Sequence, residues 1–171
     1  MSAELNSAVE RPRMPIRLTV NGRVVETEIE PREMLLDFLR DRLGLTGAKR
    51  SCDVQVCGAC TVLLDGVPVS ACCTLAYEAR DRKVTTIEGL EVDGKLHFLQ
   101  EAFISNTAVQ CGFCTSGMIL TVSSLLEENP QPTREEIRAH LRGNLCRCTG
   151  YWNIFEAIET AIEQQEEGRS E

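Results

Sequence analysis

The sequence predicts an α+β protein in which a small domain of strands and helix is followed by an all-helical domain. Apolar and polar residues alternate on both sides of Asn21-Gly22, which is typical of a β-hairpin. Four segments in the second half carry apolar residues at helical spacing, which indicates a small four-helix bundle. The polar stretch 88–94 separates the two parts, so we expect a domain boundary there.

Composition excludes several classes of protein. With 171 residues, of which 43% are apolar, the chain can build one or two small cores. Its net charge of −8 argues against a nucleic-acid partner. No run of apolar residues is long enough to span a membrane. Residues 1–15 carry neither an apolar core nor a twin-arginine pair, so we expect a flexible N-terminal arm and a cytoplasmic protein.

The first domain is expected at residues 16–90. Pro31 is an acceptable first residue for its helix, and Gly44 ends that helix. The turn of its second hairpin is Asp65-Gly66. The expected elements are a hairpin over 16–30, a helix over 31–44, a hairpin over 61–71, a short helical piece over 75–79 and a strand over 84–87.

The second domain is expected at residues 91–165 and is followed by a charged tail, 166–171, that we expect to fray. Asn129-Pro130 stops one helix, and Thr133 with Glu136 forms a capping box that starts the next. The four helices are expected over 95–106, 115–128, 134–142 and 152–164.

Nine cysteines in a chain expected in the cytoplasm argue against disulfides. The spacing of Cys52, Cys57 and Cys60 is that of plant-type ferredoxin ligands. Because a hairpin returns the chain to its starting end, the residues after the second hairpin come back beside Cys60. We choose Cys72 as the fourth ligand, although its neighbour Cys73 is only one residue away. Cys73 is then expected to be a small buried apolar residue.

A second group comprises Cys111, Cys114, Cys146 and Cys148. The helices between the two pairs run out and back, so Cys146 is expected to return beside Cys111. In an extended loop, Cys146 and Cys148 point to the same side, which completes a cage of four thiolates. Thiolates bind both zinc and iron–sulfur clusters. Zinc is the commoner occupant of such pairs, but the 52/57/60 triplet and the one-residue gap are unusual for zinc knuckles.

The sequence resembles the small iron–sulfur subunits of the molybdenum hydroxylases, the xanthine oxidase and aerobic carbon monoxide dehydrogenase family. The resemblance covers residues 16–163 and rests on three motifs: Cys52-x4-Cys57-Gly58-Ala59-Cys60 with Thr61-Val62-Leu63-Leu64-Asp65-Gly66 leading to Cys72, then Gln110-Cys111-Gly112-Phe113-Cys114, and Gly143-Asn144-Leu145-Cys146-Arg147-Cys148-Thr149-Gly150-Tyr151. Three positions depart from the family's usual residues, namely Ser51, Val56 and Ser116.

The resemblance implies a plant-type ferredoxin-like β-grasp domain followed by a helical domain, with one 2Fe–2S centre in each. The implied ligands are Cys52, Cys57, Cys60 and Cys72 for the first centre and Cys111, Cys114, Cys146 and Cys148 for the second. It also implies that Gln110 and Cys148 approach the molybdopterin of a large subunit, and that the first centre faces the FAD of a medium subunit.

The implied function is that of an electron-transfer subunit, which passes electrons from molybdenum to FAD within a dimer of heterotrimers. No substrate chemistry is expected on this chain alone. Carbon monoxide, aldehydes, purines and N-heteroaromatics are all possible substrates of the complex, and a carbon monoxide dehydrogenase-like enzyme is the first expectation.

Two other functions remain open from the sequence. One is a free-standing carrier with two clusters, and the other is an interaction module stapled by zinc. His97 and His140 are given no ligand role. Arg147 either contacts an anionic cofactor or partner, or forms a hydrogen bond near the second centre.

Overall fold

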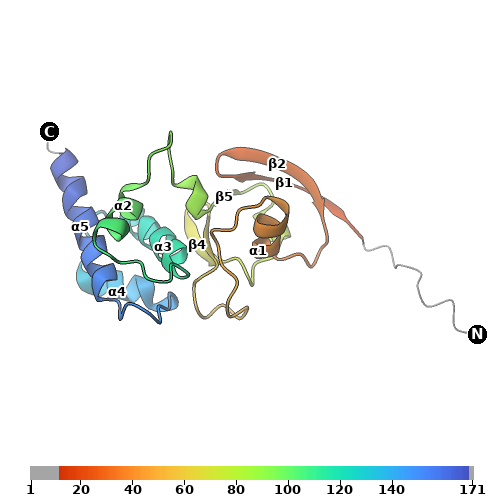
Figure 1. Cartoon of the computed structure of the whole chain (residues 1–171). Helices are drawn as coiled ribbons and strands as arrows, with labels where there is room; N and C mark the ends of the chain where they lie inside the picture. The colour runs from red at the N-terminus through yellow and green to blue at the C-terminus, as the bar shows by residue number, and fades with distance from the viewer. Residues whose placement is uncertain (1–11, 170–171) are drawn as a thin grey trace, which may run out of the picture.

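The computed structural model describes residues 12–169, so most of the arm expected at 1–15 lies outside the described residues. The described chain is an α+β structure, as predicted. A sheet built by the first half and a group of helices built by the second lie at opposite ends of the molecule (Figure 1).

The N-terminal hairpin is confirmed. Strands β1 (Met14–Val20) and β2 (Arg23–Ile29) pair antiparallel, with Val20 opposite Arg23. The two turn residues, Asn21 and Gly22, have φ of 49° and 77°, which is the conformation that a two-residue hairpin turn requires. Strand β1 begins inside the segment that was expected to be flexible.

Three further strands complete a mixed sheet in the order β2-β1-β5-β3-β4. They are β3 (Thr61–Leu64), β4 (Val67–Ser70) and β5 (Lys83–Thr85). Strand β5 pairs parallel with β1 and antiparallel with β3, so it joins the two hairpins into one sheet. The predicted strand over 84–87 ends earlier than expected, because Ile87–Gly89 forms the short 3-10 turn η3.

The helix of the first domain begins later than predicted. It consists of α1 (Leu35–Asp37), which continues as the π-helical turn η1 (Phe38–Arg42). The prediction that it starts at Pro31 is wrong, since Met34 is extended and forms a β-bridge with Leu75. The 3-10 turn η2 (Ala76–Ala79) follows that bridge, as expected. Four fully buried side chains anchor the helix on the sheet, namely Leu35, Leu36, Phe38 and Leu39.

The second half contains α2 (Phe98–Ser105), α3 (Thr115–Glu128), α4 (Arg134–His140) with the 3-10 turn η4 (Leu141–Gly143), and α5 (Trp152–Arg169). The bounds of α3 agree with the prediction. Helix α2 starts three residues late because His97 is extended and caps it, accepting a hydrogen bond from the Leu99 N–H. The predicted capping box of Thr133 and Glu136 is present.

Helix α5 extends beyond the predicted end at 164 and into the segment 166–171 that was expected to fray. Residues 163–167 of this helix are all glutamate or glutamine, which are good helix formers. Among the described residues, no helix is both long and apolar enough to cross a bilayer.

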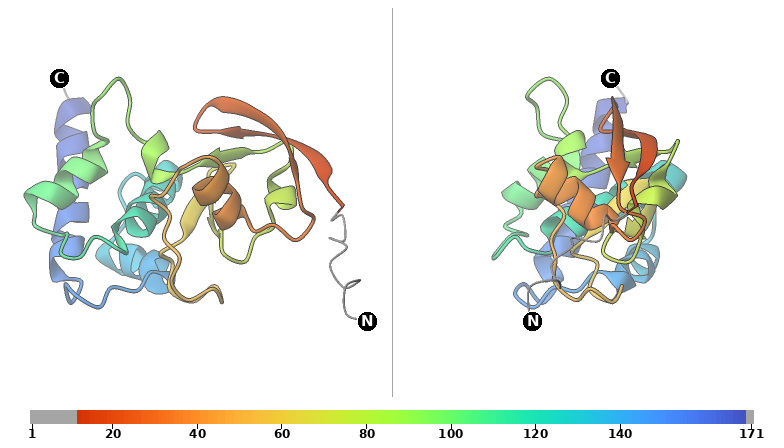
Figure 2. Two further views of the ribbon diagram at one scale, coloured as in Figure 1. Left: turned by 45° about the vertical axis from the view of Figure 1, so that its right-hand side comes forward. Right: turned by 90° about the vertical axis from the view of Figure 1, so that its right-hand side faces the viewer.

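Helix α3 connects the two halves of the molecule. It packs on α2 and α4 of the helical part and also on β3 and β4 of the sheet (Figure 2). Its Ser116 hydroxyl donates to the Gly47 carbonyl at 2.8 Å, and its Ser124 hydroxyl donates to the Gly66 carbonyl at 2.8 Å. The buried hydroxyls of α3 therefore fix the sheet against the helices through satisfied hydrogen bonds.

Candidate metal centres

Three cysteines of the first group, Cys52, Cys57 and Cys60, lie on the loop between η1 and β3. Asp53, Gln55 and Gly58 have positive φ, so this loop curls tightly and turns backbone N–H groups inward. The Val56 N–H donates to the Cys52 sulfur at 3.4 Å. The N–H groups of Val54, Val56 and Cys57 together lower the pKa of Cys52 to about 6. Cys52 is therefore a thiolate at neutral pH, which is the form that binds metals.

The hairpin of β3 and β4 delivers Cys72 beside Cys60, as predicted. Thr61 pairs with Ser70, and both cysteines just beyond this pair are buried. Burial raises the pKa of Cys60 to about 12, and the Cys72 thiol adds to the effect. The Cys57 thiol interacts with Cys52 and also with Cys60. The structure thus brings all four predicted residues of the first group together.

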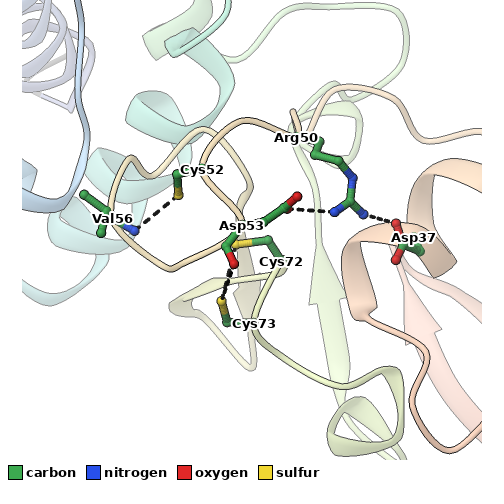
Figure 3. Close-up of polar contacts among 7 residues, drawn as sticks. All are labelled: Asp37, Arg50, Cys52, Asp53, Val56, Cys72 and Cys73. Carbon is green, nitrogen blue, oxygen red and sulfur yellow. Dashed lines mark hydrogen bonds and ion pairs between the residues drawn. The ribbon is translucent and has the colours of Figure 1, made fainter.

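Cys73 departs from its prediction. It is exposed rather than buried, so the expectation of a small buried apolar residue is wrong. The turn after β4 directs its thiol outward, where it donates to the Asp53 carbonyl at 3.7 Å (Figure 3). Its sulfur still lies 3.6 Å from that of Cys72. The two neighbours therefore differ in exposure, because Cys72 faces the inside of the loop and Cys73 lies on its outer face.

The second group lies next to the N-terminal end of α3, where Cys114 is the N-cap residue. Cys111 and Cys114 precede that helix, and Cys146 and Cys148 follow η4. The Cys148 thiol donates to the Cys111 sulfur at 3.5 Å, and the thiols of Cys114 and Cys146 form a hydrogen bond. The predicted return of the chain through α3 and α4 is thus confirmed. Cys111 and Cys148 are exposed, whereas Cys114 and Cys146 are half-buried.

The pKa values of the half-buried residues Cys114 and Cys146 are shifted in opposite directions. Burial raises the pKa of Cys114 to about 12. Burial acts in the same direction on Cys146, but the hydroxyl and N–H of Thr149 outweigh it and lower the pKa of that thiol. The Thr149 N–H donates to the Cys146 sulfur at 3.4 Å, and its hydroxyl oxygen lies 3.1 Å from the same sulfur. Thr149 therefore favours the thiolate form of Cys146.

Tyr151 stabilises the loop that carries Cys146 and Cys148 through its side-chain hydroxyl. Its hydroxyl accepts a hydrogen bond from the Cys146 N–H at 2.8 Å and donates to the Asn144 carbonyl at 3.2 Å. Tyr151 was quoted within a motif but was given no role, and no local pattern predicts its contacts with Cys146 and Asn144.

The loops of the two groups touch each other. The Leu145 N–H donates to the Cys57 carbonyl at 2.9 Å, and the side chain of Asn144 donates to the Gly58 carbonyl at 3.4 Å. A Cβ at Gly117 would lie 2.1 Å from the Gly58 carbonyl oxygen, so only glycine permits this approach. Sequence reasoning missed the contact, and a glycine inside the apolar helix α3 was its only local signal.

A cavity of about 460 Å³ opens where the two groups meet. Its wall includes Cys57 of the first group, all four cysteines of the second, and the exposed side chain of Arg147. Gln110 is exposed immediately before Cys111. His97 caps α2, and His140 is the last residue of α4.

The donor sets suit iron–sulfur chemistry. Each group supplies four thiols, and backbone N–H groups point at sulfur, as they do around clusters. Within residues 12–169, no three His, Cys, Asp or Glu side chains converge tightly enough to hold a single metal ion. The thiols instead approach one another in pairs, and a cluster with two irons spreads its four ligands over two metals.

A mixed-sheet domain and a helical domain, each with four neighbouring thiols, define the class of iron–sulfur proteins with two centres. Residues 18–85 match the family model described as "2Fe-2S iron-sulfur cluster binding domain", and residues 86–159 match "[2Fe-2S] binding domain". The chain belongs to the small iron–sulfur subunits of the xanthine oxidase family, as its motifs predicted.

Three relatives illustrate this family. The chain is 48% identical to the nicotinate dehydrogenase small FeS subunit of Eubacterium barkeri, with 89% of this chain and 97% of the relative covered. It is 50% identical to the nicotine 6-hydroxylase small subunit of Paenarthrobacter nicotinovorans, with 85% and 88% covered. A chain of quinoline 2-oxidoreductase from Pseudomonas putida 86 superposes with a TM-score of 0.85 at 48% identity, with 89% and 94% covered.

Proposed function

We propose that this chain is the electron-transfer subunit of an oxidoreductase complex and that its two cysteine groups each hold one 2Fe–2S centre. The observation that carries the proposal is the contact between the two groups, in which Leu145 of one loop is hydrogen-bonded to Cys57 of the other. Two redox centres on loops that touch can exchange electrons within one chain. The family match supports the same function.

The proposed ligands are the eight predicted cysteines. Cys52, Cys57, Cys60 and Cys72 would hold the first centre, and Cys111, Cys114, Cys146 and Cys148 the second. Bound clusters supply one-electron transfer. The chain's own residues hold the sulfurs in place, donate N–H groups to them, and bury one side of each group.

The proposed partners are a large subunit with molybdopterin and a medium subunit with FAD. The second group would face the first of these, with Gln110 and Cys148 nearest the pterin. Both are exposed, as are Phe113 and Leu145 beside them. The first group would face the flavin subunit, and Val54 and Val56 on its loop are exposed too. Exposed apolar side chains gathered at both loops support docking surfaces there. The dimer of heterotrimers stays a prediction, which the mass of the purified complex checks.

The proposed substrate class of the complex is N-heteroaromatic. Nicotinate, nicotine and quinoline, after which the three relatives are named, all contain a ring nitrogen. These names favour such substrates over carbon monoxide, which was the first expectation. The relatives named as subunits also favour the subunit role over a free-standing carrier, and the 2Fe–2S family models favour iron over zinc.

The arrangement of the helical domain is part of the proposal. We treat α2 to α5 as a four-helix bundle, because α2 packs on α3 and α5, and α4 packs on the same two helices. The domain bounds of 16–90 and 91–165 fall at the polar segment before α2, and limited proteolysis would check them. The cytoplasmic location also stays a prediction, and cell fractionation would check it.

The experiment that tests the function is metal analysis of the full chain with EPR after reduction by dithionite. We expect about four irons and four acid-labile sulfides per chain and two distinct reduced signals. Zinc without sulfide would overturn the redox assignment. Half of the iron with a single signal would show that one of the two cysteine groups is not a cluster site.

A further inference from the structure

Arg50 links the first cysteine loop to helix α1 of the same domain. Its guanidinium donates to Asp53 in the loop at 2.7 Å and to Asp37, the last residue of α1 (Figure 3). One fork-shaped cation thus joins two carboxylates that are distant in sequence. A single exposed ion pair contributes little to a structure, but a guanidinium that bonds two carboxylates restrains both segments at once.

Asp53 is the point at which this link acts on the cysteines. It follows Cys52 directly and has a φ of 53°, a conformation that a residue with a side chain does not favour. Its carbonyl accepts the hydrogen bond from Cys73, while its carboxylate is held by Arg50. Contacts on both sides therefore fix the turn that presents Cys52 to the other sulfurs.

The charge of Arg50 also matters for electron transfer. When a thiolate-bound 2Fe–2S centre accepts one electron, one ferric ion becomes ferrous and the site gains one negative charge. A nearby cation stabilises that reduced state, and a nearby carboxylate destabilises it. Arg50 and Asp53 lie next to the same loop but carry opposite charges, so their removal shifts the potential in opposite directions.

We propose that Arg50 is a positioning residue of the first centre, which fixes the Cys52 loop through Asp53 and raises the midpoint potential of that centre. The inference rests on the proposed function, in which the Cys52 group binds a cluster. The electron comes from the second centre in the complex, or from dithionite in the test.

The test compares Arg50→Gln, Asp53→Asn and Arg50→Lys in the full chain with its clusters. Iron and sulfide are measured first, and each centre is then titrated by EPR at controlled potentials. We expect Arg50→Gln to shift the midpoint potential of the first centre downward and Asp53→Asn to shift it upward. Arg50→Lys keeps the positive charge but cannot donate to Asp53 and Asp37 with the two-pronged geometry of a guanidinium. It should therefore preserve the potential and release iron to a chelator faster than the parent chain. The second centre should not shift in any variant.

Arg82→Gln is the matched control. Arg82 donates to Asp65 at 2.6 Å in a pair with side-chain exposures of 41% and 45%, close to the 41% and 46% of Arg50 and Asp53. Arg82 directly precedes β5, and Asp65 lies in the turn between β3 and β4, so Arg82→Gln should leave both potentials unchanged. Equal potentials in all variants, or shifts of Arg50→Gln and Asp53→Asn in the same direction, would overturn the proposal. A parent chain without iron and sulfide would instead refute the proposed function.

Discussion

The backbone N–H of Leu145 donates a hydrogen bond to the carbonyl oxygen of Cys57 across 2.9 Å. Cys57 is a proposed ligand of the first centre, and Leu145 directly precedes Cys146, a proposed ligand of the second. A path of one hydrogen bond and the few covalent bonds on either side of it therefore connects Cys57 with Cys146. Asn144, which is buried, adds a second bond to the neighbouring Gly58. Close contact of the loops is what an intramolecular electron transfer requires.

The first prediction concerns Gly117, which allows the loops to meet. In Gly117→Ala the added Cβ would lie 2.1 Å from the Gly58 carbonyl oxygen, a backbone atom that cannot swing aside. We expect a loss of about 1–3 kcal/mol of unfolding free energy, as for other overpacked sites. Slower transfer between the centres should accompany it. Urea denaturation and freeze-quench EPR would measure the two effects.

Gly143→Ala is the control for that variant. No atom lies within 4 Å of the position its Cβ would take, and Gly143 contributes to the same junction. It should leave both the unfolding free energy and the transfer rate close to those of the parent. Equal effects of the two alanines would contradict the steric argument.

The second prediction separates the two adjacent cysteines. Cys72→Ser should lose the iron and the EPR signal of the first centre, because Cys72 is the buried neighbour of Cys60. Cys73→Ser should keep both, because its thiol is exposed. Iron analysis and EPR of the two variants, prepared side by side, provide the measurement. Loss of the signal in Cys73→Ser alone would mean that the ligand was assigned one residue too early.

Features that depend on contacts between residues close in sequence were predicted correctly. The hairpin at Asn21-Gly22, the capping box at Thr133 and the bounds of α3 depend on neighbours in sequence, and all three were predicted. The return of Cys146 to Cys111 was predicted because the two helices between them fix the path of the chain.

The errors arose where distant residues decide the local structure. The start of α1 is set by the bridge between Met34 and Leu75, which no local pattern reveals. The exposure of Cys73 depends on the turn that places it over Asp53. The link from Arg50 to Asp37 and the contact of Leu145 with Cys57 join segments that only the folded chain brings together.

The third prediction concerns the capping box of α4 and its dependence on pH. The backbone N–H and hydroxyl of Thr133 hold the pKa of Glu136 below its ordinary value of 4.5. A carboxylate with a lowered pKa stabilises the fold above that ordinary value, and the contribution is lost as the pH falls through the lower value of the folded chain. Glu136→Gln should therefore be less stable than the parent at neutral pH, and the difference should vanish in acid.

Thermal unfolding at a series of pH values would check this. Thr133→Ala, which removes the capping hydroxyl, should cost about 1 kcal/mol at neutral pH. Glu135→Gln is the control, because Glu135 lies in the same first turn of α4. A stability difference for Glu136→Gln that persists unchanged in acid would rule out the carboxylate as its cause.

The fourth prediction concerns Thr149, whose hydroxyl lies 3.1 Å from the Cys146 sulfur. When that sulfur is a thiolate, the hydroxyl is the donor. A hydrogen bond to a ligand sulfur disperses negative charge, so it stabilises the reduced centre and raises its potential. Thr149→Val has nearly the same shape but no hydroxyl, and it should lower the midpoint potential of the second centre while the first stays unchanged.

Thr149→Ser keeps the hydroxyl and the backbone N–H, so it should retain most of the potential of the parent. Redox titration followed by EPR distinguishes the two centres. If valine and serine lowered the potential equally, the lost methyl packing or a moved loop would explain the shift, and the hydroxyl would have no part in setting it.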